Sequence, residues 1–153
     1  MYKCEHYIES IYYKLEQTAK YCRYLGYQIF QNLDTPITMD EFVALDVIMV
    51  HGGICQRELA KIILKDRANT GRILNSLEKK GYITRYADTK NNRLVRKMTM
   101  TEEGIAITKQ VSDQLREYID KLPKIFSDND KKELLKSLEK FRNCLEKEVE
   151  MNI

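Results

Sequence analysis

Apolar residues recur at intervals of three and four along most of this chain, a spacing that predicts amphipathic helices. We expect helices over residues 5–31, 38–50, 56–64, 67–80, 101–122 and 127–148. Residues 82–86 and 94–100 instead alternate in polarity, which predicts two strands joined by a long tip of sequence DTKNNR. The pattern therefore predicts a mainly helical protein with one small β-hairpin.

Residues with strong capping preferences mark the ends of several helices. Thr38 and Glu41 have the spacing of a capping box, in which each side chain accepts a hydrogen bond from the other's backbone N–H. Asp66 is expected to cap the helix over residues 67–80, and Gly81 to end it in a left-handed conformation. Pro123 stops the helix before it. The helix boundaries are thus predicted by local chemistry.

Two short helices with a tight junction, residues 56–64 and 67–80, have the pattern of a helix-turn-helix. The expected hairpin follows directly and would form a wing, so the fold class is a winged helix-turn-helix lobe plus a helical dimerisation lobe. Apolar positions of the second helix are expected to face inward: Ile73, Leu74 and Leu77. Its polar positions are expected to face mostly outward: Asn69, Thr70, Arg72, Asn75 and Ser76.

Positive charge is concentrated in this central segment. Residues 57–97 hold 12 Lys/Arg and 4 Asp/Glu, a net charge of +8, and the rest of the chain holds 14 and 19, a net charge of −5. A basic segment neutralises phosphates and releases counterions, which favours salt-dependent binding to nucleic acid. The charge distribution therefore predicts double-stranded DNA as a partner.

The long helices at both ends carry apolar stripes that a small central lobe cannot cover. Residues 1–153 are expected to form a single unit, with residues 38–100 as the DNA-binding lobe and residues 1–35 and 102–153 as dimerisation helices. The first helix is rich in tyrosine, suited to a dimer core or to the wall of a pocket, and Cys22 falls on its apolar pattern. We expect a twofold homodimer whose recognition helices lie about 34–36 Å apart.

Three stretches resemble the MarR family of bacterial transcription regulators: DRANTGRIL at 66–74, LEKKGYI at 77–83 and MTEEG at 100–104. The resemblance extends over nearly the whole chain in the order of its elements. It implies that Arg72 is the usual arginine of the recognition helix, that Arg93 of the wing reaches the minor groove, and that Asp88 helps to orient Arg93. The expected DNA-binding residues are Arg67, Asn69, Thr70, Arg72, Asn75, Asp88, Lys90 and Arg93.

Three positions depart from the family pattern. Asn91 stands where the wing usually carries an acid, and Asn92 stands where a second basic residue is usual. Gly71 replaces a β-branched or hydroxyl residue and has no side chain with which to contact a base. Base readout would then shift to its neighbours, where asparagine suits adenine and arginine suits guanine.

Two modes of regulation are open. The resemblance implies a repressor released from a palindromic operator by a small aromatic effector, for which the candidate residues are Tyr13, Arg23, Tyr24 and His51. The alternative is a thiol-based sensor that uses Cys55 or another cysteine; Cys55 is favoured because a cysteine at a helix N-terminus has a stabilised thiolate. Cys55 could instead have only a structural role, as a small buried residue in the place of a capping serine.

Other classes of function have weaker signals. No apolar run is long enough to cross a membrane and no signal-peptide core is present, so we expect a cytoplasmic protein with four mostly free thiols. Two histidines, no phosphate-binding glycine loop and no nucleophile elbow argue against an enzyme or a cofactor. The cysteines and histidines lack zinc spacing, so no metal is expected. A winged-helix module that binds protein is the remaining alternative.

Overall fold

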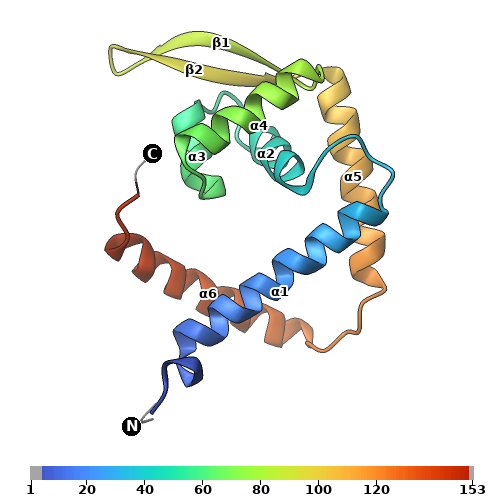
Figure 1. The fold of residues 1–153 in the computed structure, drawn as a ribbon, viewed down its shortest axis with the longest axis vertical. Helices are drawn as coiled ribbons and strands as arrows, with labels where there is room; N and C mark the ends of the chain where they lie inside the picture. The colour runs from blue at the N-terminus through green and yellow to red at the C-terminus, as the bar shows by residue number, and fades with distance from the viewer. Residues whose placement is uncertain (1–4, 152–153) are drawn as a thin grey trace.

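The computed structural model describes residues 5–151 and forms a mainly helical chain with one antiparallel hairpin (Figure 1). The predicted fold class is confirmed. The elements in chain order are η1 (Tyr7–Glu9), α1 (Ile11–Asn32), α2 (Met39–Val50), α3 (Gln56–Ile63), α4 (Arg67–Lys79), β1 (Ile83–Lys90), β2 (Arg93–Met100), α5 (Glu102–Asp120) and α6 (Asp128–Glu148).

The central lobe contains the apolar core. Helices α2, α3 and α4 pack against one another, against the base of the hairpin and against the first half of α5. Val111 of α5 is fully buried in this core, so the core continues past the boundary expected at residue 100. The largest fully buried apolar side chains are Leu45, Ile48, Leu59, Leu74, Leu77, Ile83, Met98 and Val111.

The helix ends follow the predicted caps. Thr38 and Glu41 form the expected capping box, with the Glu41 N–H donating to Thr38 Oγ1 at 3.1 Å and the Thr38 N–H donating to Glu41 Oε1 at 3.3 Å. The Asn69 N–H donates to Asp66 Oδ1 at 2.7 Å, which caps α4, and Gly81 follows that helix with a φ of +80°. Local side-chain chemistry therefore sets these boundaries.

The first helix is shorter than expected. A helix was predicted over residues 5–31, but the chain forms the short helix η1, then an extended Ser10, and only then α1. The Tyr13 N–H donates to the Ser10 hydroxyl at 3.3 Å, so Ser10 caps a new helix. Gly26 of α1 is buried against the Met39 side chain, where a glycine permits the close approach of α1 to α2.

The hairpin is longer and its turn tighter than the sequence suggested. The strands pair in register from Ile83 with Met100 to Lys90 with Arg93, which leaves Asn91 and Asn92 as a two-residue turn. Both asparagines have positive φ, 52° and 61°. A two-residue turn that follows the strand twist requires this conformation, and asparagine tolerates it better than the charged residues usual in the family.

Gly104 allows α5 to start against the junction between α4 and β1. Thr101 caps α5, and its hydroxyl donates to the Gly81 carbonyl at 2.6 Å while its N–H donates to the Tyr82 carbonyl at 3.1 Å. A methyl group on Gly104 would overlap that same Tyr82 carbonyl oxygen. The glycine of the MTEEG stretch is therefore needed for close packing rather than for a turn.

Glu41 ties the recognition helix to α2. Its carboxylate is buried and accepts from Lys80 Nζ at 2.8 and 3.0 Å and from Ser76 Oγ at 3.3 Å. Lys80 also donates to the Pro36 carbonyl at 2.8 Å. These bonds join the end of α4 to the start of α2 across more than 30 residues of sequence, so they fix the placement of the recognition helix.

Replacing Lys80 with alanine is expected to lower the free energy of unfolding by about 2–3 kcal/mol, because it leaves the buried Glu41 carboxylate without its cation. Chemical denaturation measures the change. Lys79→Ala, one residue earlier on an exposed face of the same helix, is the control and should change stability by less than about 0.5 kcal/mol. Equal effects of the two changes would show that the buried pair does not stabilise the lobe.

The end of α1 packs against this lobe, but the first part of α1 and the whole of α6 bury little. Figure 1 shows α1 and α6 crossing below it, with α5 running down to them. Tyr12 of α1 and Phe141 of α6 touch, with ring centroids 5.4 Å apart, but no residue of α6 is buried. Cys22, whose position on the apolar pattern of α1 predicts burial in the core, is exposed in the single chain, so that prediction is wrong for one chain alone. The apolar stripes of these helices remain uncovered.

Candidate nucleic-acid interface

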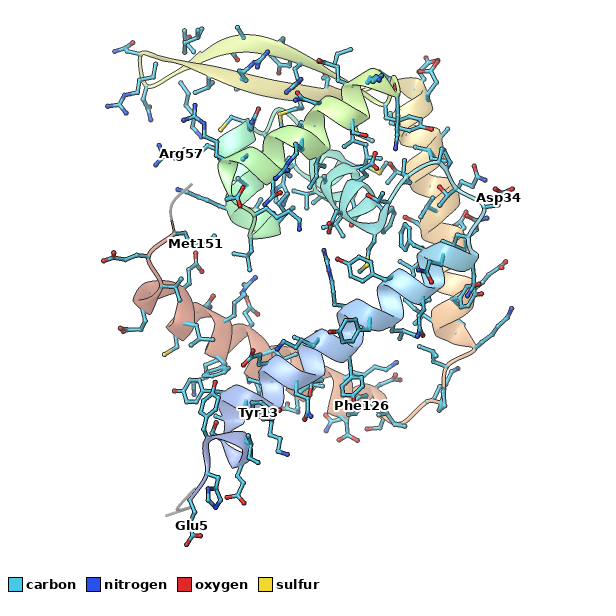
Figure 2. All side chains as sticks on the ribbon, viewed as in Figure 1. Glu5, Tyr13, Asp34, Arg57, Phe126 and Met151 are labelled. Carbon is cyan, nitrogen blue, oxygen red and sulfur yellow. The ribbon has the colours of Figure 1, made fainter. Side chains whose placement is uncertain are left out.

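A concavity of about 430 Å³ lies between the helix-turn-helix and the hairpin. Four arginines line it: Arg57 of α3, Arg67 of α4, and Arg93 and Arg96 of β2. Figure 2 shows Arg57 at the start of α3 beneath the hairpin, well away from Tyr13 on α1. Segments far apart in sequence thus place four positive charges around one hollow, which suits a polyanion.

Three of these four arginines have no acidic residue paired with them in the described part of the chain. No carboxylate within residues 5–151 forms an ion pair with Arg57, Arg67 or Arg93. Arg93 also stands directly across the hairpin from Lys90, and facing like charges destabilise a strand pair. Glu58 of α3 forms an ion pair with Lys90 and relieves part of this repulsion. An anionic partner would relieve the rest.

Asp88 does not orient Arg93, contrary to the expectation from the resemblance. Its carboxylate pairs with Lys97 at 2.9 Å, while Arg93 lies toward the tip, across from Lys90. Asp88 lies opposite Val95, so Arg93 and Lys97 are both its diagonal neighbours on the same face of the hairpin, and the ion pair forms with Lys97. The hydrogen bond from Lys97 lowers the pKa of Asp88, and the same bond raises the pKa of Lys97.

The exposed side of α4 is polar, as expected for a DNA-reading helix and not for a protein-docking one. Arg67, Asn69, Arg72 and Asn75 are all exposed. Thr70 is fully buried, so the expectation that it faces outward is wrong. Its hydroxyl donates to the Asp66 carbonyl at 2.8 Å inside the lobe. Its spacing from Ile73, Leu74 and Leu77 is the signal that places it on the inner face.

Two carboxylates on α4 are held in their charged form by hydrogen bonds. The backbone N–H and the side-chain amide of Asn69 lower the pKa of Asp66, and the positive charge of Arg72 adds to the effect. The guanidinium of Arg85 on β1 lowers the pKa of Glu78, with which it forms a salt bridge at 3.0 Å. At neutral pH both acids stay ionised, and both are occupied by neighbouring donors.

Gly71 is not required by packing. A Cβ atom built there would lie 3.7 Å from Gln56 Nε2, an ordinary contact. Gly71→Ala is expected to raise the free energy of unfolding by about 0.5–1 kcal/mol, since alanine favours a helix interior. Thermal denaturation tests this.

The control for this substitution is Gly81→Ala. Gly81 has a φ of +80°, so a side chain there is strained, and alanine should destabilise the protein by about 1 kcal/mol. A loss of stability in Gly71→Ala would mean that the recognition helix needs this glycine to fold.

Several residues of this surface escape sequence reasoning. Arg57, Arg96 and Gln56 line the concavity, yet their helix and strand patterns do not single them out. Arg85 is nearly buried and contacts both Asn75 and Glu78 on α4. The local excess of basic residues was the one sequence signal that pointed to Arg57, Arg85 and Arg96.

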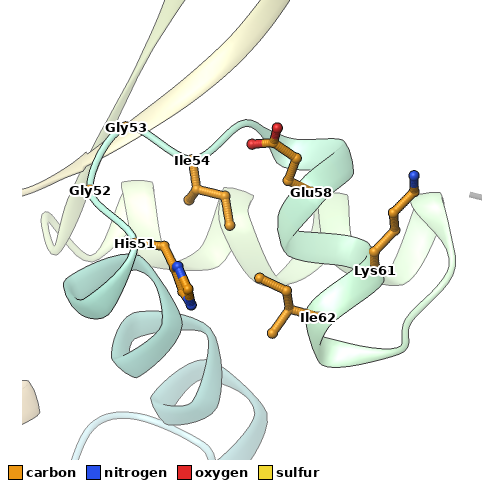
Figure 3. Close-up of a pocket in the computed structure, with 7 residues that line it drawn as sticks. All are labelled: His51, Gly52, Gly53, Ile54, Glu58, Lys61 and Ile62. Carbon is orange, nitrogen blue, oxygen red and sulfur yellow. The ribbon is translucent and has the colours of Figure 1, made fainter. Parts of the chain in front are cut away.

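The expected effector residues do not form one site within the chain. His51 lines a shallow concavity of about 470 Å³ with Ile54, Lys61 and Ile62 (Figure 3), and no residue of α1 takes part in it. Arg23 instead pairs with Asp40 of α2 and donates to the Tyr27 hydroxyl at 3.0 Å. Tyr24 is exposed and Tyr13 half-buried on α1.

Cys55 lies at the N-cap of α3, as predicted, and is buried. Its N–H donates to Glu58 Oε2 at 3.1 Å, as the backbone of the N-cap residue does in a capping box. Burial restricts access to an oxidant, and this favours the structural role over the sensor. Cys4 lies outside the described residues. Within those residues, no three His, Cys, Asp or Glu side chains come together as a metal site, and no helix is long and apolar enough to cross a membrane.

The fold and this surface define a winged helix-turn-helix protein. Residues 37–95 match the model of the MarR family. A curated relative, the uncharacterized HTH-type transcriptional regulator YybA of Bacillus subtilis (strain 168), is 33% identical over 75 residues, 49% of this chain. That match spans 48%, about half, of the relative's length. The central segment of the chain is therefore similar to the MarR family, the resemblance that the sequence motifs led us to expect.

Solved structures share the fold across nearly the whole chain. The Staphylococcus aureus MepR–DNA complex matches with a TM-score of 0.71 and 20% identity, covering 92% of this chain and 99% of that chain. Bordetella bronchiseptica BpsR, described for regulation of its DNA binding by 6-hydroxynicotinic acid, matches with a TM-score of 0.72 and 18% identity, covering 92% and 98%. At these identities the similarity establishes the fold.

Proposed function

We propose that this protein is a sequence-specific DNA-binding regulator that represses transcription as a cytoplasmic homodimer on a palindromic operator. The observation that carries the proposal is the arginine-lined concavity between α4 and the hairpin. It joins the recognition helix and the wing into one basic surface, and this favours binding of a polyanion such as a duplex. MepR, a protein of the same fold, has a structure in complex with DNA.

The homodimer is supported by the surface that one chain leaves exposed. Its accessible area is 11943 Å², whereas a folded monomer of 18.1 kDa exposes about 8,100 Å². The excess of about 3,800 Å² per chain, about 7,600 Å² for two chains, is large enough to supply the interface of a permanent dimer, which buries about 2,000–5,000 Å² or more in total. Much of the exposed apolar surface lies on the terminal helices, including Tyr21 and Tyr24 of α1 and Leu134, Leu138 and Leu145 of α6. A second copy of the chain would cover these stripes.

A small aromatic effector would release the DNA. The concavity beside His51 is the position we favour for it, because Ile54 and Ile62 supply apolar walls and Lys61 a positive charge at the rim. BpsR provides a precedent of the same fold, since its DNA binding is regulated by 6-hydroxynicotinic acid. An effector that binds here would contact the residues that join α2 to α3.

One experiment tests the dimer and its DNA together. Sedimentation should give a dimer, and a gel-shift titration should show duplex binding that weakens steeply as salt rises. Leu138→Asp on α6 should shift the protein toward monomer and weaken operator binding, while Glu139→Lys, a charge change at an exposed neighbour, should not. Repeating the titration with aromatic carboxylic acids tests release. A lone chain with no affinity for any duplex at low salt would refute the proposal.

A further inference from the structure

The side-chain acceptors on the recognition helix are already occupied. Asp66 accepts from the backbone N–H of Asn69 at 2.7 Å and from its side-chain Nδ2 at 2.8 Å. Glu78 accepts from Arg85 through both oxygens, at 3.0 Å for Oε1 and 3.1 and 3.3 Å for Oε2. Both carboxylates are therefore already engaged with neighbouring donors.

The two asparagines are occupied in the same way. Asn69 Oδ1 accepts from Arg72 Nη2, while its Nδ2 donates to Asp66. Asn75 Oδ1 accepts from Arg85 Nη2 at 2.6 Å. A guanidinium has only donors, so the amide oxygen must face it in both cases, and this fixes which way each amide points. The groups that remain wholly unengaged within the described residues are donors: the remaining N–H groups of Arg72 and the Nδ2 amine of Asn75.

We propose that Asn69 and Asn75 position donors rather than read adenine, and that α4 therefore selects guanine over adenine where it meets the major groove. This inference rests on the proposed DNA binding. Guanine presents two acceptors there, N7 and O6, whereas adenine presents one acceptor and the N6 amine, a donor. An asparagine reads adenine by using its oxygen and its nitrogen together. In this protein, the oxygen of Asn75 is held by Arg85 and that of Asn69 by Arg72.

Arg85 is then a positioning residue for specificity. It lies on β1, its side chain is 9% exposed, and it acts on the operator through the Asn75 amide. Removing it frees Asn75 Oδ1 to accept from adenine N6. Its partner Glu78 must be neutralised at the same time, since an unpaired carboxylate would repel DNA.

Selection of bound sequences from a random duplex pool tests the inference with the full chain. The unaltered protein should enrich guanines at the positions α4 contacts. Replacing one of them with 7-deazaguanine, which lacks the N7 acceptor, should weaken binding by about five- to tenfold. Enrichment of adenine at a position whose preference disappears in Asn75→Ala or Asn69→Ala would overturn the inference.

A pair of variants isolates the role of Arg85. The double variant Arg85→Met/Glu78→Gln should reduce the preference for guanine over adenine at one position by about tenfold. Glu78→Gln alone keeps the Arg85–Asn75 hydrogen bond and should leave the preference unchanged. An unchanged preference in the folded double variant would overturn the inference. The selection with the unaltered chain decides the matter even if the double variant does not fold, and absence of binding to any duplex would overturn the proposed function itself.

Discussion

Replacing Arg93 with alanine is expected to weaken operator binding by about ten- to a hundredfold at low salt, and to reduce the slope of log affinity against log salt by about one. Arg93 is exposed, lies beside the turn of the hairpin and lines the basic concavity. It faces Lys90 across the strands, so its charge destabilises the free hairpin and is neutralised only by an anion. A salt titration by fluorescence anisotropy measures both quantities.

Arg116→Ala is the matched control. Arg116 is an exposed arginine on α5 that pairs with Asp113 at 3.6 Å, remote in sequence from the helix-turn-helix and the hairpin. Its loss should leave the salt slope unchanged, although both substitutions remove one positive charge. Equal effects of the two would mean that DNA binding depends on net charge and not on this surface. An unchanged slope in Arg93→Ala would remove Arg93 from the interface.

Gly104→Ala should lower the free energy of unfolding by about 3 kcal/mol or more, the largest stability effect expected of a single methyl group in this chain. The new Cβ would overlap the Tyr82 carbonyl oxygen and lie 2.9 Å from its carbonyl carbon. Both belong to the backbone, and the oxygen already accepts from the Thr101 N–H. The first turn of α5 would have to move away from the lobe, and the melting temperature should fall by about 6–12 °C.

Gly52→Ala serves as the control for this substitution. Gly52 lies in the turn after α2, and a Cβ there meets nothing within 4 Å. Alanine at this position should change the melting temperature by no more than about 2 °C. A normal melting temperature for Gly104→Ala would show that α5 does not seat against Tyr82 as described.

The accuracy of sequence reasoning depended on how far apart the interacting residues lie. The capping box of Thr38 and Glu41 and the cap at Asp66 were predicted because each joins residues three positions apart. The turn at Asn91 and Asn92 was missed because the strand register, not composition, decides where a hairpin turns. Thr70 was misplaced because a polar residue was assumed to face water, although its hydroxyl finds a partner inside the lobe.

The candidate DNA surface shows the same division. The sequence predicts its helix-turn-helix and its excess of positive charge, and the family resemblance points to Arg72 and Arg93. The Lys97 partner of Asp88 and the Arg85 partner of Asn75 do not, since each is brought into contact by strand pairing or by packing of a helix on a hairpin. The effector residues were grouped by chemical type, and the fold separates His51 from those on α1.

Local forces therefore let the sequence by itself determine which segments become helices, where most of them begin and end, and which third of the chain carries the positive charge. Only the tertiary structure decided that four arginines from α3, α4 and β2 surround one hollow, and that Arg85 of β1 donates to the amide oxygen of Asn75 on α4. The physical reason is that caps and periodicity act within a few residues, whereas these contacts form between segments that meet only when the core packs.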